Sequence, residues 1–320
     1  MKKILSIDGG GVKGTLPASF LAHVEEHLDG SVAEYFDLIV GTSTGGIIAL
    51  GLGLGMTAKE ILGLYAELGP KVFRRNGGKL ARIAKMISKP MYEDVPLKEA
   101  LEPHFGGRRL GESRNRLVIP AFDFDSCDAY LYKTAHHKRL MNDYKAPAMD
   151  VALATSAAPM FFPAHRNCHS VPLVDGGVWC NNPVLVAAME GADVLSWDPS
   201  EIRILSLGCS QAPLDWSTPG KTPEGMADWV KSLLIVELFY QAQSAAAMNM
   251  ATLRLGGDQS RIYRINPVVA PDAYSLDGID GIDSLKGKGY VIARKEFRHL
   301  KDTFFSAKAE PFTPEYVLCG

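Results

Sequence analysis

The chain has 320 residues, of which 47% are hydrophobic, 22% charged and 9% aromatic, so it can form a continuous core and is too weakly charged for a disordered state. With 34 Lys and Arg against 36 Asp and Glu, the formal net charge is −2, which leaves no global positive field to bind a nucleic acid polymer. The five cysteines form an odd set without a CxxC spacing, which argues against a disulfide scaffold and a structural zinc.

We expect no export signal at the N-terminus. A secretory signal needs an apolar core of roughly 7–15 residues, whereas only residues 4–7 form an apolar run before Asp8. The expected location is therefore the cytoplasm. The uncharged stretch 38–58 is about as long as a membrane span, but six glycines interrupt it, which favours a strand, a tight turn and a buried helix.

Two strand–turn–helix units open the chain. Residues 3–8 form an apolar run that ends in three glycines, and 15–28 follow with apolar residues at helical spacing. Residues 35–40 form a second run, which leads through a glycine turn at 41–45 into an apolar helix toward Leu54. Two such units in succession predict parallel strands joined by crossover helices.

Four further apolar runs are candidates for strands of the same sheet: 117–122, 171–174, 192–195 and 202–207. Together with the first two units they predict one α/β domain over residues 1–320, in which a mostly parallel sheet lies between two layers of helices.

The remaining segments complete the predicted organisation. Residues 211–225 are expected to form a long loop, and 226–255 a long helix that packs on the sheet or on a sister subunit, so a homo-oligomer is one expectation. The irregular region 69–96 is the expected place for a lid.

A serine lies in the second glycine turn. Gly41-Thr42-Ser43-Thr44-Gly45 fits the Gly-x-Ser-x-Gly pattern of a nucleophile elbow, with a predicted strand before it and a helix after it. The glycines suit a strained turn that another backbone must approach closely. Ser43 is therefore the candidate nucleophile, and the alternative is a tight turn without chemistry.

A serine hydroxyl needs a base, which is usually a histidine downstream of the acid. Only His299 follows position 175, and it lies in the charged stretch 294–301, which is typical of a solvated helix end. His23 and His27 are spaced like a metal-binding pair, but no third ligand has a recognisable spacing, so we expect no metal.

The alternative base is Asp175, which ends an apolar run and precedes two glycines. An ordinary Asp has a pKa of about 4 and is a poor base near neutral pH, so burial would have to raise that pKa. A Ser–Asp dyad in a dry cleft is physically workable, and a simple turn after a strand is the competing interpretation.

The first glycine turn offers backbone donors. The stretch 8–14 reads Asp-Gly-Gly-Gly-Val-Lys-Gly, so the amides of Gly9, Gly10 and Gly11 suit an oxyanion or a phosphate. The same letters contain Gly-x-Gly-x-x-Gly, but a dinucleotide site wants an acid about 20 residues later at the end of the second strand. That strand ends in the serine turn instead, which favours an oxyanion loop serving Ser43.

These three blocks, 8–14, 41–45 and 175–177 in that order, resemble the signature blocks of the patatin-like phospholipases. The segments 154–159 and 178–183 are similar to connecting segments of the same family, and the resemblance spans roughly residues 3–210. It implies a mostly parallel sheet between helices, Ser43 as nucleophile, Asp175 as its base and Gly9, Gly10 and Gly11 as the oxyanion loop, with no metal or organic cofactor.

Two positions depart from the family pattern. Lys13 stands where the family often has Arg, which keeps the positive charge and loses a bidentate fork. After residues 205–208 the expected Thr-Gly is replaced by Cys209-Ser210, so we expect a differently shaped loop there.

The basic segment 71–89 is a candidate membrane contact. It holds seven Lys and Arg and no acidic residue, and a short amphipathic helix of this kind suits docking on an anionic bilayer. A solvated helix that caps the core is the alternative. The resemblance also extends to compact bacterial enzymes that cyclic dinucleotides switch on in antiphage defence, which makes a cyclic dinucleotide an expected activator.

The sequence therefore predicts a serine hydrolase that cleaves carboxylic ester bonds of membrane phospholipids in the cytoplasm or at the inner membrane surface. An acyltransferase or a soluble esterase on the same dyad remains open, and so does a nucleotide-binding sensor with an inert Ser43. Trp179 and Phe161-Phe162 are candidates for lining the acyl cleft.

Overall fold

The computed structural model describes residues 1–73, 89–214, 234–271 and 273–318. In these residues one eight-stranded sheet has the order β5-β6-β3-β2-β1-β7-β8, and β4 pairs with β3 outside this path. The strands are β1 (Lys2–Ile7), β2 (Leu38–Gly41), β3 (Arg116–Asp123), β4 (Asp128–Lys133), β5 (His165–Arg166), β6 (Pro172–Asp175), β7 (Ile202–Leu207) and β8 (Ile262–Ile265). The pairs β1–β2, β1–β7, β2–β3 and β7–β8 are parallel, whereas β4, β5 and β6 form antiparallel pairs.

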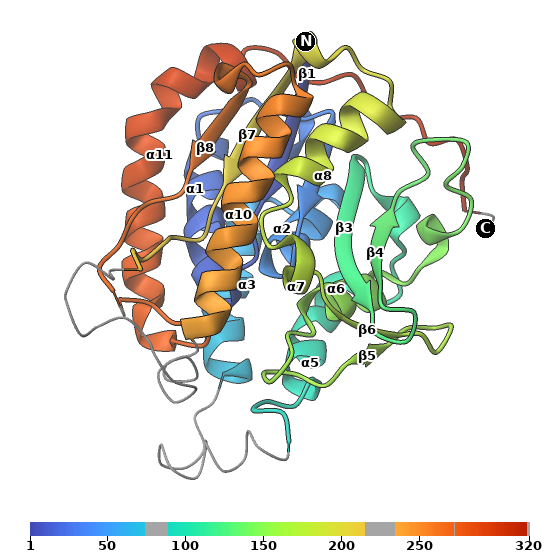
Figure 1. Cartoon of the computed structure of the whole chain (residues 1–320), viewed down its shortest axis with the longest axis vertical. Helices are drawn as coiled ribbons and strands as arrows, with labels where there is room; N and C mark the ends of the chain where they lie inside the picture. The colour runs from blue at the N-terminus through green and yellow to red at the C-terminus, as the bar shows by residue number, and fades with distance from the viewer. Residues whose placement is uncertain (74–88, 215–233, 272, 319–320) are drawn as a thin grey trace.

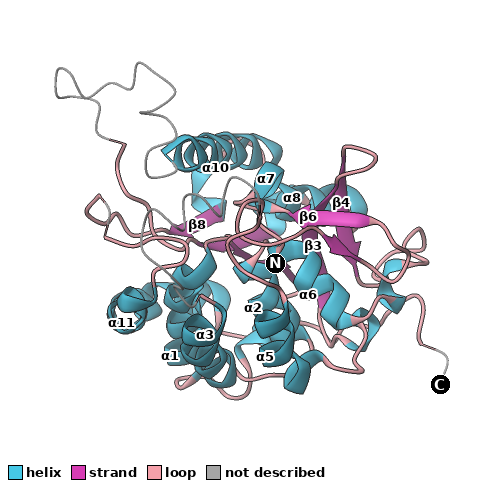
Figure 2. Cartoon of the chain, turned by 90° about the horizontal axis from the view of Figure 1, so that it is seen from below, coloured by secondary structure: helices cyan, strands magenta, loops and turns pink. Residues whose placement is uncertain are grey.

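Helices cover both faces of this sheet (Figure 1). The α-helices of the described residues are α1 (Thr15–Glu25), α2 (Thr44–Gly53), α3 (Ala58–Val72), α5 (Val95–Phe105), α6 (Ala148–Ser156), α7 (Gly177–Cys180), α8 (Val184–Met189), α10 (Leu234–Arg254) and α11 (Ile282–Phe304). Figure 2 shows α1, α2, α3, α5, α6 and α11 on one side of the sheet and α7, α8 and α10 on the other. The fold is the three-layer α/β arrangement that the sequence predicts.

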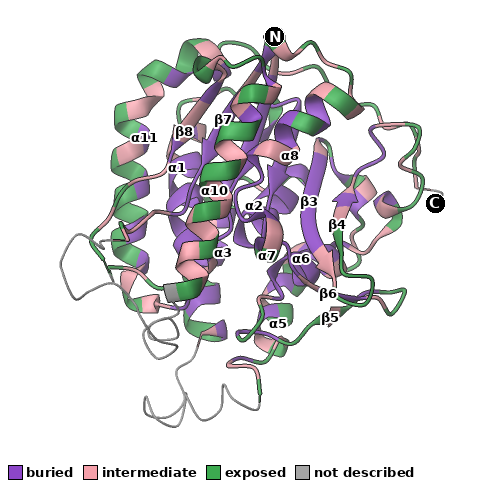
Figure 3. Cartoon of the chain, in the orientation of Figure 1, coloured by how far each residue is buried: buried purple, intermediate pink, exposed green. Residues whose placement is uncertain are grey.

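Side chains along the central strands point alternately to the two faces of the sheet, so each face has its own cluster of buried hydrophobic residues. Leu5 and Ile7 of β1 join the larger cluster, on the α1–α2 side, whereas Ile4, the residue before Leu5, belongs to the cluster under α8. Because both faces are covered, β1 and β2 are buried at nearly every position (Figure 3). The adjacent apolar residues Ile4-Leu5 and Leu38-Ile39-Val40 made these strands recognisable in the sequence.

Most predicted strands are confirmed, with shifts of a few residues, but the strand at 192–195 is wrong. The chain there continues from α8 into a π-helical turn over Glu190–Val194, closed by the Leu195 amide donating to the Glu190 carbonyl. Glu190 is buried and its carboxylate binds Lys133 and His136, which holds this turn in place. The positions on both sides of β1 in the sheet are taken by β2 and β7.

Some predictions fall outside the described residues. These are most of the basic segment 71–89 and of the lid region 69–96, at 74–88, and the chain from 215 to 233, which holds part of the predicted loop and the start of the predicted helix. The rest of that helix is α10, which lies beside α8 and α7 (Figure 2). Within the described ranges, no helix is both long enough and apolar enough to cross a membrane.

Candidate active site

The parallel strands deliver both glycine turns to one edge of the sheet. Ile7, the last residue of β1, is in register with Gly41 at the end of β2 and with Leu207 at the end of β7. The loop after β1 and the turn after β2 therefore meet at the carboxyl edge, where ligands bind in open α/β sheets. Asp175 reaches the same edge from the end of β6, opposite Ala121 of β3.

Ser43 occupies a strained turn between β2 and α2. Its backbone has φ 54° and ψ −122°, a conformation that residues other than glycine rarely adopt. Gly41 and Gly45 make this turn feasible, because a Cβ on Gly41 would overlap the carbonyl oxygen of Gly45, and one on Gly45 would overlap that of Ile7. The strand–turn–helix geometry that the sequence predicts around Ser43 is thus observed.

Hydrogen bonds from outside the turn hold it in place. The Ser43 amide donates to Thr155 Oγ1 over 2.9 Å, and the Thr42 hydroxyl donates to the Cys180 carbonyl over 2.7 Å. The Thr155 hydroxyl in turn donates to the Pro120 carbonyl of β3 over 2.6 Å. Thr155 lies in a segment that carried the family resemblance, yet its supporting role could not be assigned from the sequence.

Ser43 and Asp175 are in direct contact. The Ser43 hydroxyl donates to Asp175 Oδ2 over 2.6 Å, and the Gly177 amide donates to Asp175 Oδ1 over 2.7 Å. Burial raises the pKa of Asp175 to about 7, against the lowering effect of these two hydrogen bonds. A carboxylate with this pKa can accept a proton near neutral pH, which is the property that the sequence argument required.

The glycine loop presents two free amides. Within the described chain, the amides of Gly10 and Gly11 donate to no acceptor, and both residues line the pocket beside Ser43. The Gly9 amide, by contrast, donates to the Asn181 carbonyl over 2.9 Å. Of the three glycines expected to serve an oxyanion, Gly10 and Gly11 therefore have amides available, and Gly9 anchors the loop.

The departure from the family pattern at Cys209-Ser210 lies directly beside the glycine loop. Ser210 has φ 99°, in the region that favours glycine, so serine adopts the conformation suited to the glycine it replaces. Cys209 packs under Gly10, where a Cβ on the glycine would lie 2.5 Å from the Cys209 Cβ. Cys209 therefore leaves no room for a side chain at position 10.

A largely apolar pocket opens beside Ser43 and Asp175. It has a volume of about 740 Å³, counted with the solvent at its mouth. Its apolar walls come from α2, α3, α5 and the segment before β5, with Ile47, Leu68, Val72, Phe73, Leu97, Phe161 and Phe162 among the lining residues. Phe161 and Phe162 lie where the sequence predicts them, whereas Trp179 is not among the lining residues and instead donates from its indole to the Ala121 carbonyl over 2.8 Å.

Tyr240 closes one side of this pocket. It extends from α10, and burial raises its pKa, with the charge of Asp175 adding to the shift. Gln243, one turn later, accepts from the Asn181 amide over 3.3 Å and donates to the Val178 carbonyl over 3.0 Å. The sequence identified this helix but gave no sign that it faces the site.

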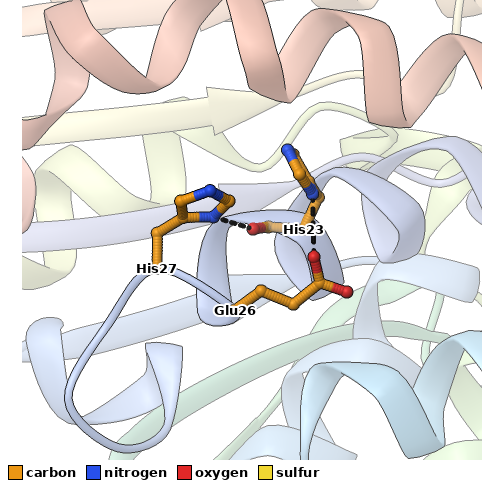
Figure 4. Close-up of side chains that lie close together, drawn as sticks. All are labelled: His23, Glu26 and His27. Atoms are coloured by element: carbon orange, nitrogen blue, oxygen red, sulfur yellow. Dashed lines mark hydrogen bonds and ion pairs between the residues drawn. The ribbon is translucent and has the colours of Figure 1, made fainter.

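The histidines lie elsewhere. Among the described residues that line the pocket there is no histidine, and His299 is exposed on α11. His23 and His27 lie at the end of α1 with Glu26 as a third neighbouring group, which the sequence argument missed (Figure 4). Glu26 accepts from His23 over 3.0 Å, and the two rings pack on Tyr290 and Phe297 of α11. These contacts account for both histidines as residues of the α1–α11 packing.

Known proteins match most of this chain. A family model described as patatin-like phospholipase matches residues 5–188. A cGAMP-activated phospholipase of Pseudomonas aeruginosa is 30% identical over 298 residues, covering 91% of this chain and 88% of that protein. One of the same name from Escherichia coli is 34% identical over 198 residues, covering 59% and 55%. Patatin-like protein 2 of Oryza sativa subsp. indica is 31% identical over 300 residues, covering 80% and 72%.

Proposed function

This chain belongs to the patatin-like phospholipase family, and on that premise we propose that it is a serine hydrolase of membrane phospholipid esters. Ser43 is the nucleophile and Asp175 its base. The observation that carries this proposal is the 2.6 Å hydrogen bond from the Ser43 hydroxyl to a buried carboxylate whose pKa burial raises to about 7. An acyl-ester substrate fits the apolar pocket beside these two groups.

The reaction follows from the positions of these groups. Asp175 takes the hydroxyl proton while Ser43 Oγ attacks the ester carbonyl, and the amides of Gly10 and Gly11 stabilise the negative oxygen of the tetrahedral intermediate. The intermediate then expels the alcohol, which receives the proton from Asp175. Asp175 next deprotonates a water molecule that attacks the acyl-Ser43 ester, and the fatty acid leaves as Ser43 regains its proton.

The pocket suits the acyl chain of the substrate. A Leu68→Trp substitution in α3 should narrow it, because Leu68 is buried in the pocket wall. Since each buried methylene contributes about 0.8 kcal/mol, loss of two methylene contacts should lower kcat/KM on long-chain esters about tenfold and leave short-chain esters almost unchanged. The measurement is kcat/KM over a series of p-nitrophenyl esters of increasing chain length.

Ala66→Trp supplies the matched control, because Ala66 is exposed on the same helix. The acyl assignment would be wrong if both variants, or neither of them, changed the chain-length profile. Release of free acid against transfer to added glycerol or lysolipid separates a hydrolase from an acyltransferase, and activity on vesicles against dissolved esters separates a phospholipase from a soluble esterase.

We also propose that a cyclic dinucleotide activates the enzyme, in the cytoplasm or at the inner membrane surface, as part of antiphage defence. The support is the name of two relatives, cGAMP-activated phospholipase, one of which is matched over most of its length. Addition of cyclic GMP–AMP should raise fatty acid release from phospholipid vesicles at least about tenfold, a coupling of about 1.4 kcal/mol. Linear GMP and AMP are the control nucleotides, and an equal rate with and without every cyclic dinucleotide tested would refute this activation.

A further inference from the structure

A partly buried ion pair, Arg264–Asp8, lies next to the glycine loop. Arg264 of β8 donates to both carboxylate oxygens of Asp8, with one of the two distances 2.7 Å, and it also donates to Ser206 Oγ over 2.8 Å. Asp8 is the residue before Gly9, so this pair joins the far edge of the sheet to the start of the glycine loop. The mechanism above gives neither residue a role.

Sheet register brings these two residues together over 256 positions of sequence. Ser6 of β1 pairs with Ser206 of β7, and Ser206 pairs with Arg264 of β8. Because side chains alternate along a strand, Asp8 continues on the same face as Ser6. The long Arg264 side chain spans β7 on that face and meets Asp8 just past the end of β1.

Backbone hydrogen bonds fix the glycine loop at three positions. The Asp8 amide donates to the Leu207 carbonyl, the Gly9 amide to the Asn181 carbonyl and the Val12 amide to the Leu276 carbonyl. Between these three hydrogen bonds, only the amides of Gly10 and Gly11 have no acceptor among the residues that the structure describes. The orientation of those two amides therefore depends on how the backbone leaves Asp8, whose side chain is fixed by Arg264 alone among the described hydrogen-bond donors.

We propose that Arg264 is a positioning residue for the reaction. Its bidentate hydrogen bonding to Asp8 fixes the Gly10 and Gly11 amides in the orientation that binds the oxyanion. This inference rests on the proposed function. Without the guanidinium, Asp8 is a buried carboxylate without its partner, so it must take up a proton or move, and the loop moves with it. A planar fork that binds both oxygens is a task that Lys cannot reproduce fully.

The test compares Arg264→Met and Arg264→Lys with wild type on a dissolved ester and on its thionoester, in which sulfur replaces the carbonyl oxygen. Loss of well-placed amides affects the transition state and spares substrate binding, so kcat should fall about 100-fold in Arg264→Met while KM stays within about threefold. The preference for the oxygen ester over the thionoester should shrink, because sulfur is the weaker hydrogen-bond acceptor. Arg264→Lys should lie between wild type and Arg264→Met in both measurements.

Arg261→Met is the matched control, because the Arg261 side chain is 19% exposed against 16% for Arg264 and pairs with Asp258 instead. Its kcat and oxygen-to-sulfur preference should equal those of wild type. Unchanged kcat in folded Arg264→Met, or a lower kcat with an unaltered oxygen-to-sulfur preference, would overturn the inference. If Arg264→Met does not fold, wild-type values in Arg264→Lys overturn it and intermediate values support it.

The proposed function can fail separately. Wild-type enzyme that cleaves no ester and leaves Ser43 unlabelled by a fluorophosphonate would overturn the hydrolase proposal and this inference together. If wild type is active and the Arg264 variants have the same kcat and oxygen-to-sulfur preference as wild type, only the positioning role would be overturned.

Discussion

Replacement of Ser43 by Ala should lower ester hydrolysis by about 10⁴-fold or more, because among the described residues that line the pocket no other hydroxyl donates to a buried carboxylate. The free amides of Gly10 and Gly11 and the apolar pocket stay in place in this variant. Residual rate above the uncatalysed reaction is therefore expected to come from binding and oxyanion stabilisation alone. The assay is release of free fatty acid from phospholipid vesicles, with cyclic GMP–AMP present.

A fluorophosphonate probe gives an independent measure of the same residue. Wild type should be labelled once, at Ser43, and Ser43→Ala should stay unlabelled. Ser19→Ala is a suitable control, because Ser19 is also a buried serine but its hydroxyl donates to the Lys286 carbonyl between α1 and α11. Full hydrolysis by Ser43→Ala would assign the activity to another nucleophile.

Replacement of Asp175 by Asn should have two opposite effects, on activity and on stability. Asn cannot accept the Ser43 proton, so the rate should fall about 10⁴-fold. Burial raises the pKa of Asp175 from its ordinary 3.8 to about 7, so between these values the folded chain holds a proton that the unfolded chain has released. Stability therefore declines as the pH rises through that window, and above about pH 7 the buried charge costs about 4 kcal/mol.

The neutral amide of Asn removes this cost while it keeps hydrogen bonds available to Ser43 and Gly177. Asp175→Asn should thus be inactive and more stable than wild type at pH 8, with little difference at pH 4. Asp150 supplies a control of opposite sign, because its hydrogen bonds to His165 and Cys168 lower its pKa despite the effect of burial. Asp150→Asn should lose stability at pH 8. Urea unfolding at both pH values measures these differences.

The same carboxyl sets the acid limb of the pH profile. Since Asp175 must be ionised to act as a base, kcat/KM should fall tenfold for each pH unit below about 7. Rates on a soluble ester from pH 5 to pH 8 measure this limb, because such an assay contains no lipid surface whose charge changes with pH. A rate that does not vary over this range would contradict the assignment of Asp175 as the base.

Much of this architecture was accessible from local sequence patterns. The runs that became β1 and β7 hold adjacent apolar residues, Ile4-Leu5 and Ile204-Leu205, and Gly41 and Gly45 flank Ser43 because the turn leaves no room for a Cβ. Such signals lie within a few residues of one another, so they can be recognised without knowledge of the fold. The strand predicted at 192–195 failed because its local pattern also suits a helix, and the buried ion pairs of Glu190 decided between them.

By itself, the sequence determined the α/β class, the serine turn, the glycine loop and the acid at the end of a strand, because each is encoded by neighbouring residues. Only the tertiary structure decided which groups meet: Asp175 with Ser43, Asn181 with Gly9, and Arg264 with Asp8. Strand order and register set these contacts, and burial then sets their chemistry, since removal of water raises the pKa of Asp175 and leaves Asp8 dependent on one guanidinium. Neither strand order nor burial is a property of any short stretch of chain.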